Sequence, residues 1–142
     1  MRPIEVGASH TASVVVDESL TVPAVSARFP GFGSMPRVFA TAFMVGFAEA
    51  AAMGVLADYL DESEGSVGVD VRFDHTAATP IGLTVTATAT VTAVAPRMVT
   101  FAVELSDDEG PIGRGTHVRA IIDRGRFEAR VAAKAERFAP LD

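Results

Sequence analysis

The spacing of apolar positions changes once along this chain, from a helical period to a period of two. Between residues 38 and 57 every position is apolar or small except Glu49. A helix that is apolar all round is typical of a buried core element. We therefore predict a long buried helix from residue 38 to residue 59 or 60, ended by the polar run 61–65.

Beyond that break, alternation predicts strands. Val67, Val69, Val71 and Phe73 alternate with polar or small residues. In residues 83–93 the apolar residues take one face and five threonines the other, as in a strand with one buried face. Strands are expected at 10–16, 67–73, 83–93, 99–105 and 112–123, an irregular segment at 20–37, and an amphipathic helix at 126–138.

The order of these elements predicts the architecture. Consecutive strands joined by short turns form an antiparallel sheet. One apolar helix after the first strand, wrapped by such a sheet, is an α+β hot-dog fold, and we expect residues 1–142 to form a single domain. The exposed sheet edges and the open side of the helix also predict a homodimer.

Composition narrows the function classes. The net charge of −6, without a cluster of Lys and Arg, speaks against nucleic-acid binding. The chain has no cysteine, which excludes disulfides, thiolate metal sites and a cysteine nucleophile. The N-terminus lacks an apolar signal core, so a cytoplasmic location is expected. Glu49 near the centre of the apolar run, its many alanines and glycines, and the absence of a second span argue against a membrane helix.

Glu49 is the first candidate for chemistry, because an ionised carboxylate in a buried segment is costly without a partner or a role. The simpler interpretation is a buried ion pair with Arg119 or Arg114. The functional interpretation is a catalytic acid, and the sequence alone leaves both open.

Two further positions could act with this carboxylate. His75 follows a predicted strand in a loop of small residues, where catalytic groups often lie, although a surface histidine beside Asp74 is an equal alternative. Thr41 lies eight residues before Glu49, near the same helix face, unless it caps the helix. His10 is expected to be exposed, and His117 to lie in the core or an interface. Three scattered histidines give weak support for a metal site, and we expect none.

Four segments of the chain, residues 39–50, 64–68, 75–86 and 113–122, resemble the fluoroacetyl-CoA thioesterase family of hot-dog proteins in the same order and spacing. The resemblance implies a catalytic group of Thr41, Glu49 and His75. It also implies that Gly68 lines the thioester pocket and that Arg119 lies near the site or the dimer interface.

The resemblance also shows departures from the family pattern. The family's lid carries a phenylalanine pair before the helix; Phe32 matches one member, but Met35 stands at the other position. Ala50 replaces a bulky aromatic residue beside Glu49. Both changes predict a looser substrate pocket that could admit a larger acyl group.

The function predicted from these residues is hydrolysis of a small acyl-CoA thioester. Glu49 would attack the carbonyl, or Glu49 or His75 would activate water. No cofactor is expected, because coenzyme A is part of the substrate. The alternatives are a hot-dog enoyl-CoA hydratase, for which the spacing of Asp70 and His75 is a poor match, and a non-catalytic acyl-CoA binding or sensing module. Candidate phosphate contacts are Arg28, Arg37 and Arg97, without a preference among them.

Overall fold

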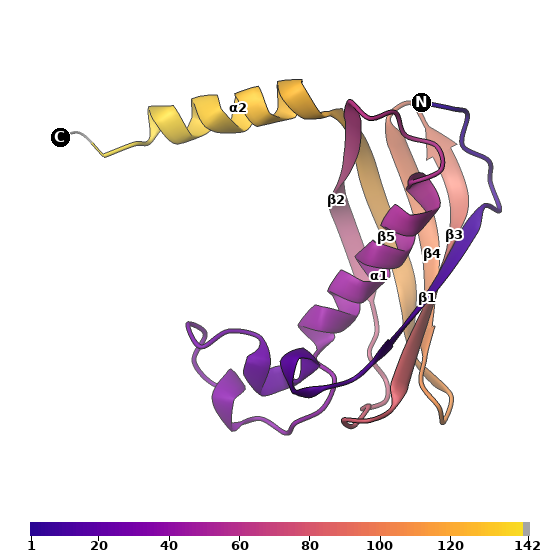
Figure 1. Ribbon diagram of the computed structural model, residues 1–142, viewed down its shortest axis with the longest axis vertical. Helices are drawn as coiled ribbons and strands as arrows, with labels where there is room; N and C mark the ends of the chain where they lie inside the picture. Colours follow the sequence, from indigo (N-terminus) through magenta and orange to yellow (C-terminus); the bar gives the residue numbers. More distant parts are fainter. Residues whose placement is uncertain (141–142) are drawn as a thin grey trace.

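A curled antiparallel sheet wraps one side of a central helix in the computed structural model, which describes residues 1–140 (Figure 1). The sheet order is β1-β3-β4-β5-β2, so β1 and β2 form its edges. In chain order the elements are β1 (Ser9–Val15), three short 3-10 helices η1 (Glu18–Leu20), η2 (Val22–Ala24) and η3 (Phe32–Ser34), α1 (Thr41–Leu56), β2 (Glu64–Phe73), β3 (Thr84–Ala95), β4 (Met98–Ser106), β5 (Pro111–Asp123) and α2 (Arg124–Arg137).

The core lies between α1 and the inner face of β3 and β4. The apolar residues of β3 predicted to face inward are buried, and its threonines form the outer face. There Thr88 bonds to Thr11 and Thr86 to Ser13 of β1, each at 2.9 Å. The predicted α+β arrangement of one helix wrapped by a sheet is therefore observed. No helix within residues 1–140 combines the length and hydropathy needed to cross a bilayer.

Helix α1 begins three residues later than predicted, at Thr41, and ends at Leu56. The reason for the late start is long-range pairing, because Val38 forms a β-bridge with Pro80, and Phe39 forms one with Thr21. Phe39 is fully buried, and its backbone N–H donates to the carbonyl of Thr79. The backbone before Thr41 is therefore held extended by two distant segments.

Strand β2 is less regular than its alternation suggested. Its register with β5 shifts between Gly68 and Asp70, so Val69 is an inserted bulge residue. Before the bulge, Ser66 and Gly68 face the helix; after it, Phe73 packs against the core. The bulge thus changes which positions point inward, and Val69 and Val71 are left 51% and 45% exposed at the sheet edge.

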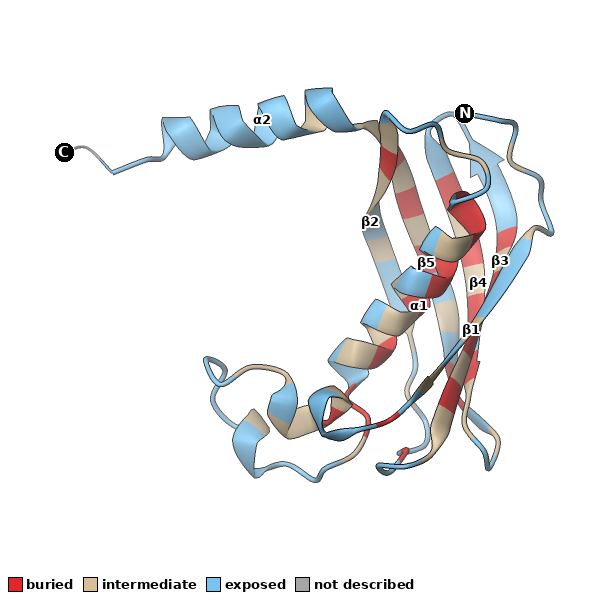
Figure 2. Cartoon of the chain, in the orientation of Figure 1, coloured by how far each residue is buried: buried red, intermediate tan, exposed pale blue. Residues whose placement is uncertain are grey.

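Helix α2 projects from the end of β5, past β2 and away from the sheet (Figures 1 and 2). Asp123 caps it by accepting from the backbone N–H of Arg126 at 2.9 Å. The helix starts two residues earlier than predicted and ends one residue earlier. None of its residues is buried, so it does not pack against the sheet or α1 as an amphipathic helix commonly does.

Candidate active site

Glu49 has a charged partner, although its side chain is less buried than the apolar run around it predicted. Its carboxylate Oε2 lies 3.0 Å from Nη1 of Arg119, with the two side chains 34% and 4% exposed respectively. The ion pair therefore forms through Arg119, one of the two candidates expected from the sequence. The side chain of Arg119 is almost completely buried, whereas the Glu49 carboxylate stays partly open to solvent.

Three further hydrogen bonds fix the Arg119 guanidinium. Its Nε donates to the hydroxyl of Ser66 at 2.8 Å, and its Nη2 donates to the carbonyl of Ser66 at 3.0 Å. Nη1 also lies 3.2 Å from Nε2 of His117. Because every nitrogen of the guanidinium is engaged, Glu49 faces a cation in a fixed position.

His117 is a core histidine that supports Arg119. It is fully buried, and its Nδ1 lies 2.8 Å from the carbonyl of Asp70. A carbonyl can only accept, so Nδ1 carries the hydrogen and Nε2 is free to accept from Arg119. The imidazole is therefore neutral in this arrangement and avoids placing a second cation beside the guanidinium.

Gly68 lets the β2 backbone approach the carboxylate. A Cβ at this position would lie 3.1 Å from Cε1 of His117 and 3.4 Å from Oε2 of Glu49. A larger side chain would fill the space beside the acid. The structure thus places Gly68 against Glu49.

The second group at the site pairs Thr41 with His75. Thr41 is the first residue of α1, and its Oγ1 lies 2.7 Å from Nδ1 of His75. The helix N-cap is Ala40, which has no side-chain cap, so the alternative that Thr41 caps the helix is wrong. His75 lies in the loop between β2 and β3, and its Nε2 is buried without a hydrogen-bond partner in the described chain. Burial lowers the pKa of His75 below its usual value, which favours the neutral imidazole.

The structure shows two pairs rather than one triad. Thr41 and Glu49 are eight residues apart on one helix, about 12 Å along its axis. Among residues 1–140 no hydrogen bond joins Glu49 to Thr41 or to His75. A cavity of about 270 Å³ borders Thr41 and His75 together with residues of the adjoining loops. Glu49 does not line this cavity.

The predicted lid residues lie before α1. Phe32 in η3 is half-buried, with its ring centroid 6.1 Å from that of Phe29, while Met35 is 49% exposed. Ala50, beside Glu49, is exposed. The aromatic pair of this segment is therefore Phe29 with Phe32, and Met35 is half exposed.

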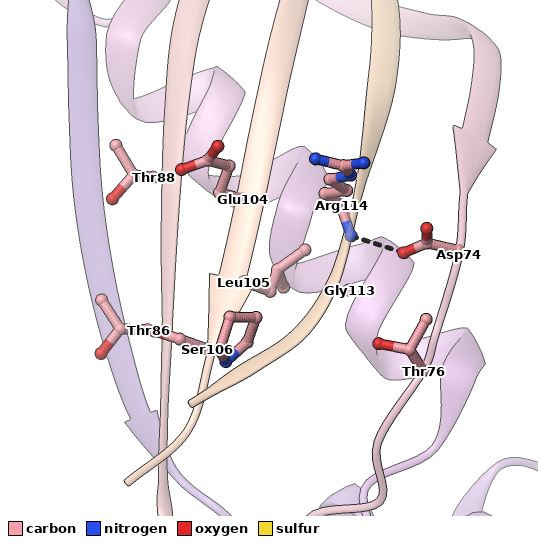
Figure 3. Close-up of a pocket in the computed structure, with 10 residues that line it drawn as sticks. Asp74, Thr76, Thr86, Thr88, Glu104, Leu105, Ser106, Gly113 and Arg114 are labelled. Atoms are coloured by element: carbon pink, nitrogen blue, oxygen red, sulfur yellow. Dashed lines mark hydrogen bonds between the residues drawn. The ribbon is translucent and has the colours of Figure 1, made fainter. Parts of the chain in front are cut away.

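A hollow of about 450 Å³ lies on the outer face of the sheet, and no residue of the two pairs lines it (Figure 3). Threonines of β3 and the charged side chains of Glu104, Arg114 and Asp74 line it. Within it the backbone N–H of Arg114 donates to Asp74 at 2.9 Å. None of the side chains predicted to react lines this hollow, so we place the candidate site at the two pairs instead.

The structure bears on two alternatives to this site. Asp70, which a hydratase would need near His75, pairs with Arg72 at 3.1 Å on the surface. Among residues 1–140, no group of three or more His, Cys, Asp or Glu side chains is arranged to hold a metal ion. The groups available at the site are therefore a paired carboxylate, a threonine hydroxyl and a neutral imidazole.

The assignment of the chain to a family rests on a match over most of its length. Residues 16–125 match the model of the fluoroacetyl-CoA-specific thioesterase family. The chain belongs to this family. As a member of the fluoroacetyl-CoA-specific thioesterase family, it is a thioester hydrolase, which confirms the resemblance and the enzyme class predicted from the sequence.

Individual relatives agree with this assignment. The fluoroacetyl-CoA thioesterase of Streptantibioticus cattleyicolor is 43% identical over 131 residues, which cover 92% of this chain and 94% of that protein. A solved structure of the fluoroacetyl-CoA thioesterase FlK superposes with a TM-score of 0.90 at 42% identity, over 93% of this chain and 98% of that one. Other structures of FlK contain acetyl-CoA, or fluoroacetate and CoA.

A more distant structure of the same architecture confirms the predicted hot-dog fold. The hot-dog-like protein of Thermanaerovibrio acidaminovorans has a TM-score of 0.79 at 27% identity, over 96% of this chain and 94% of that one. The family's segments therefore lie on the scaffold that the hydrophobic pattern predicted.

Sequence reasoning missed the residues that hold Arg119. His117 and Arg119 are two apart on one strand and so share a face, which was a usable signal. The sequence did not indicate that Ser66 faces inward. The bulge lies between Ser66 and Phe73, so the alternation that places Phe73 in the core does not predict the orientation of Ser66.

Proposed function

We propose that this protein hydrolyses a small acyl-CoA thioester with Glu49, Thr41 and His75 as the reacting side chains. The observation that carries the proposal is the Glu49 carboxylate, partly open to solvent, fixed by Arg119 and faced by the bare backbone of Gly68. An ion pair with a rigid cation keeps a carboxylate charged and oriented while leaving one side free for a substrate. The complexes of FlK with acetyl-CoA and with CoA support an acyl-CoA substrate.

Glu49 can act by either of two routes. In the first, a carboxylate oxygen bonds to the thioester carbonyl carbon, the C–S bond breaks, and the coenzyme A thiolate leaves; water then opens the resulting anhydride. In the second, Glu49 or His75 takes a proton from a water molecule that attacks the carbonyl. In both routes negative charge develops on the carbonyl oxygen, and the bulge at Val69 offers a backbone N–H outside the regular ladder to stabilise it.

His75 and Thr41 would orient the substrate and assist proton transfer. Burial lowers the pKa of His75, so the imidazole is neutral near pH 7 and able to accept a proton. Its hydrogen bond with Thr41 fixes the hydroxyl at the start of α1. No cofactor is required by either route, since coenzyme A enters with the substrate.

We also propose that the active unit is a homodimer. Helix α1 is apolar all round, yet a stripe of Ala42, Gly46, Ala50 and Met53 remains exposed on one protomer. Beside it the edge strand β2 exposes Val69 and Val71. A two-fold pairing at this edge would cover both surfaces and satisfy the open strand.

A dimer would also account for the separation of the two pairs. Thr41 and His75 of one protomer can meet Glu49 of the other if the two copies cross the open side of α1. Co-expression of Thr41→Ala and Glu49→Ala chains tests this arrangement. If the site is shared, mixed dimers contain one intact site and regain activity that neither parent has; if it is not, every site is broken and the mixture stays inactive.

The acyl group is proposed to be acetyl or a substituted acetyl group, with room for a larger one. Met35 replaces an aromatic lid residue of the family and is exposed, and Ala50 leaves space beside Glu49. Steady-state thiol release across fluoroacetyl-CoA, acetyl-CoA and longer acyl-CoAs measures the preference. A ratio of kcat/KM strongly favouring fluoroacetyl-CoA would contradict the looser pocket.

The experiment that tests the function itself is thiol release by wild type and by Glu49→Ala. Hydrolysis that depends on Glu49 supports the proposal. Equally slow release by both proteins would reject it and favour the non-catalytic acyl-CoA binding module.

A further inference from the structure

Charge is divided very unevenly between α2 and the rest of the chain. The helix carries five of the twelve basic side chains and only two of the eighteen acidic ones, a net charge of +3. The remainder therefore has seven basic and sixteen acidic side chains, a net charge of −9. The helix also projects into solvent without a buried residue (Figure 2). A cationic element on an acidic body implies an anionic ligand or partner.

Four of the five basic side chains of α2 lie on one side of the helix. Arg126, Arg130, Lys134 and Arg137 recur at intervals of four, four and three residues, which places them along one stripe. These residues are three or four positions apart in the sequence, and the helical conformation brings their side chains to one side. The stripe begins where α2 meets the sheet.

Where α2 meets the sheet, Arg97 lies near Arg126 and Arg130, the first two residues of the stripe. A hollow of about 210 Å³ is lined by Arg97, Arg126 and Arg130, together with Ile121, Ile122 and Asp123 at the end of β5. Arg97 comes from the β3–β4 turn, where its φ of 59° makes it the one non-glycine residue of positive φ in residues 1–140. Its carbonyl accepts from the backbone N–H of Ile121 at 2.9 Å, which fixes the turn against β5.

These three guanidinium groups have no carboxylate partner among residues 1–140, in contrast to Arg37, Arg72 and Arg119. The nearby Asp123 carboxylate accepts from the Arg126 backbone as the helix cap. Three like charges around one small hollow repel one another unless an anion lies between them. Guanidinium groups bind phosphate oxygens in a bidentate manner, so phosphate is the chemistry this hollow suits.

We propose that Arg97, Arg126 and Arg130 bind the phosphates of the 3′-phosphorylated ADP end of the acyl-CoA substrate. The inference rests on the proposed function and names the part of the protein that holds the other end of the same molecule. On an acidic protein, a polyanionic substrate needs a local cationic binding site, and this hollow brings three arginines together.

The distance along β5 fits this assignment. Arg119 at the candidate site and Ile121 at the hollow share the inner face of β5. From Arg119 to Asp123 the strand advances four residues, about 13 Å. The pantetheine arm between thiol and phosphate has as many backbone atoms as about four residues, a reach of about 14 Å when extended. A thioester at Glu49 can therefore place the phosphates at the base of α2.

The first test compares substrates with and without phosphate. The double variant Arg126→Gln/Arg130→Gln is assayed with acetyl-CoA and with S-acetyl-pantetheine. Loss of two charge-assisted contacts predicts that the ratio of kcat/KM for acetyl-CoA to that for S-acetyl-pantetheine falls about 10- to 100-fold. An unchanged ratio would overturn the inference.

A matched control removes two charges from the far part of the same helix. Lys134→Gln/Arg137→Gln is expected to change the ratio less than about threefold, because only screened long-range attraction is lost. If both double variants lower the ratio equally, the helix steers anions without a defined site, and the inference fails.

Binding measured without turnover separates this inference from the proposed function. Calorimetry with coenzyme A is expected to show binding to wild type and about 10- to 100-fold weaker binding to Arg126→Gln/Arg130→Gln. This result would uphold the site even if no thioester were hydrolysed. Absent or equal binding would overturn it, while leaving Glu49-dependent hydrolysis intact. Dissociation of the arginine variant into monomers, with equal loss on both substrates, would instead assign α2 to contact with a second copy.

Discussion

The polar residues at Thr41 and Glu49, two turns apart on α1, are held in opposite ways. The Glu49 carboxylate meets a guanidinium with every nitrogen engaged and only 4% of that side chain exposed. The Thr41 hydroxyl meets an imidazole on a loop through one hydrogen bond, with the second ring nitrogen unpartnered within residues 1–140. The first pair is charged and rigid, and the second is neutral and adjustable. In the function proposed above, the first pair would hold an oriented carboxylate and the second a proton-accepting imidazole.

The largest expected effect follows from removing the charge of Glu49. Glu49→Gln keeps the side-chain shape and can still accept from Arg119, so thiol release should fall about 10²- to 10⁴-fold in kcat/KM with the fold intact. Glu62→Gln, in the polar run after α1, serves as the matched control and should match wild type. Near-wild-type activity of Glu49→Gln would mean that the rigid pair is structural.

Breaking the rigid pair from its other side should mainly cost stability. Arg119→Met leaves Ser66 and His117 without their partner and Glu49 without its cation, which predicts a loss of about 2–4 kcal/mol in the free energy of unfolding. Urea denaturation measures it. Arg72→Met is the control, since its pair with Asp70 is surface-exposed and worth at most about 1 kcal/mol. Equal losses in the two variants would contradict the rigidity assigned to Arg119.

Filling the space beside Glu49 should have an intermediate effect. Gly68→Ala places a Cβ against His117 and predicts a loss of about 1–3 kcal/mol in stability, with lower kcat/KM. Gly65→Ala is the matched control on the same strand, because its Cβ would meet only the flexible end of Arg124. The prediction fails if both substitutions behave alike.

The smallest effect concerns the neutral pair and pH. Burial lowers the pKa of His75 in the folded protein, so between that pKa and the unfolded value of about 6.5 the unfolded chain binds more protons. The stability contributed by neutral His75 is therefore complete above about pH 6.5 and lost as the pH falls through the folded pKa.

Unfolding measured from pH 8 down to pH 5 tests this sign. The difference between wild type and His75→Gln should stay constant at the alkaline end and shrink in acid. If His75 titrates, the acid limb of activity should also lie below pH 6.5. A difference that grows on acidification would mean that the folded pKa of His75 is raised.

Much of the fold could be predicted because the strands carry their periodicity locally. β3 alternates apolar residues with threonines, and its observed bounds lie within two residues of those predicted. The start of α1 could not be predicted, since Val38 and Phe39 pair with Pro80 and Thr21, which are distant in sequence. The local sequence around residue 38 carries no information about such long-range bridges.

The candidate site divides in the same way. Glu49 stood out because a lone charge in an apolar run is a local anomaly. Position alone left Thr41 as a possible helix cap and His75 as a possible surface histidine, and the resemblance gave them their expected roles. The hydrogen bonds between Ser66 and Arg119 were not predicted, because they depend on the bulge that turns Ser66 inward. The exposure of α2 was also missed, since a hydrophobic pattern predicts an amphipathic helix but not whether the rest of the chain covers its apolar face.

The bulge at Val69 gives β2 one residue more than the facing part of β5. Gly68 pairs with Arg119 and Phe73 with Gly115, which lie four residues apart on one face of β5, so deleting Val69 would restore regular pairing with both residues still facing the interior. The side chain of Val69 is exposed, so many residues should also be acceptable there. The fold should therefore tolerate a changed or a missing residue at this position, and a deletion would remove only the extra backbone N–H that we propose stabilises the carbonyl oxygen.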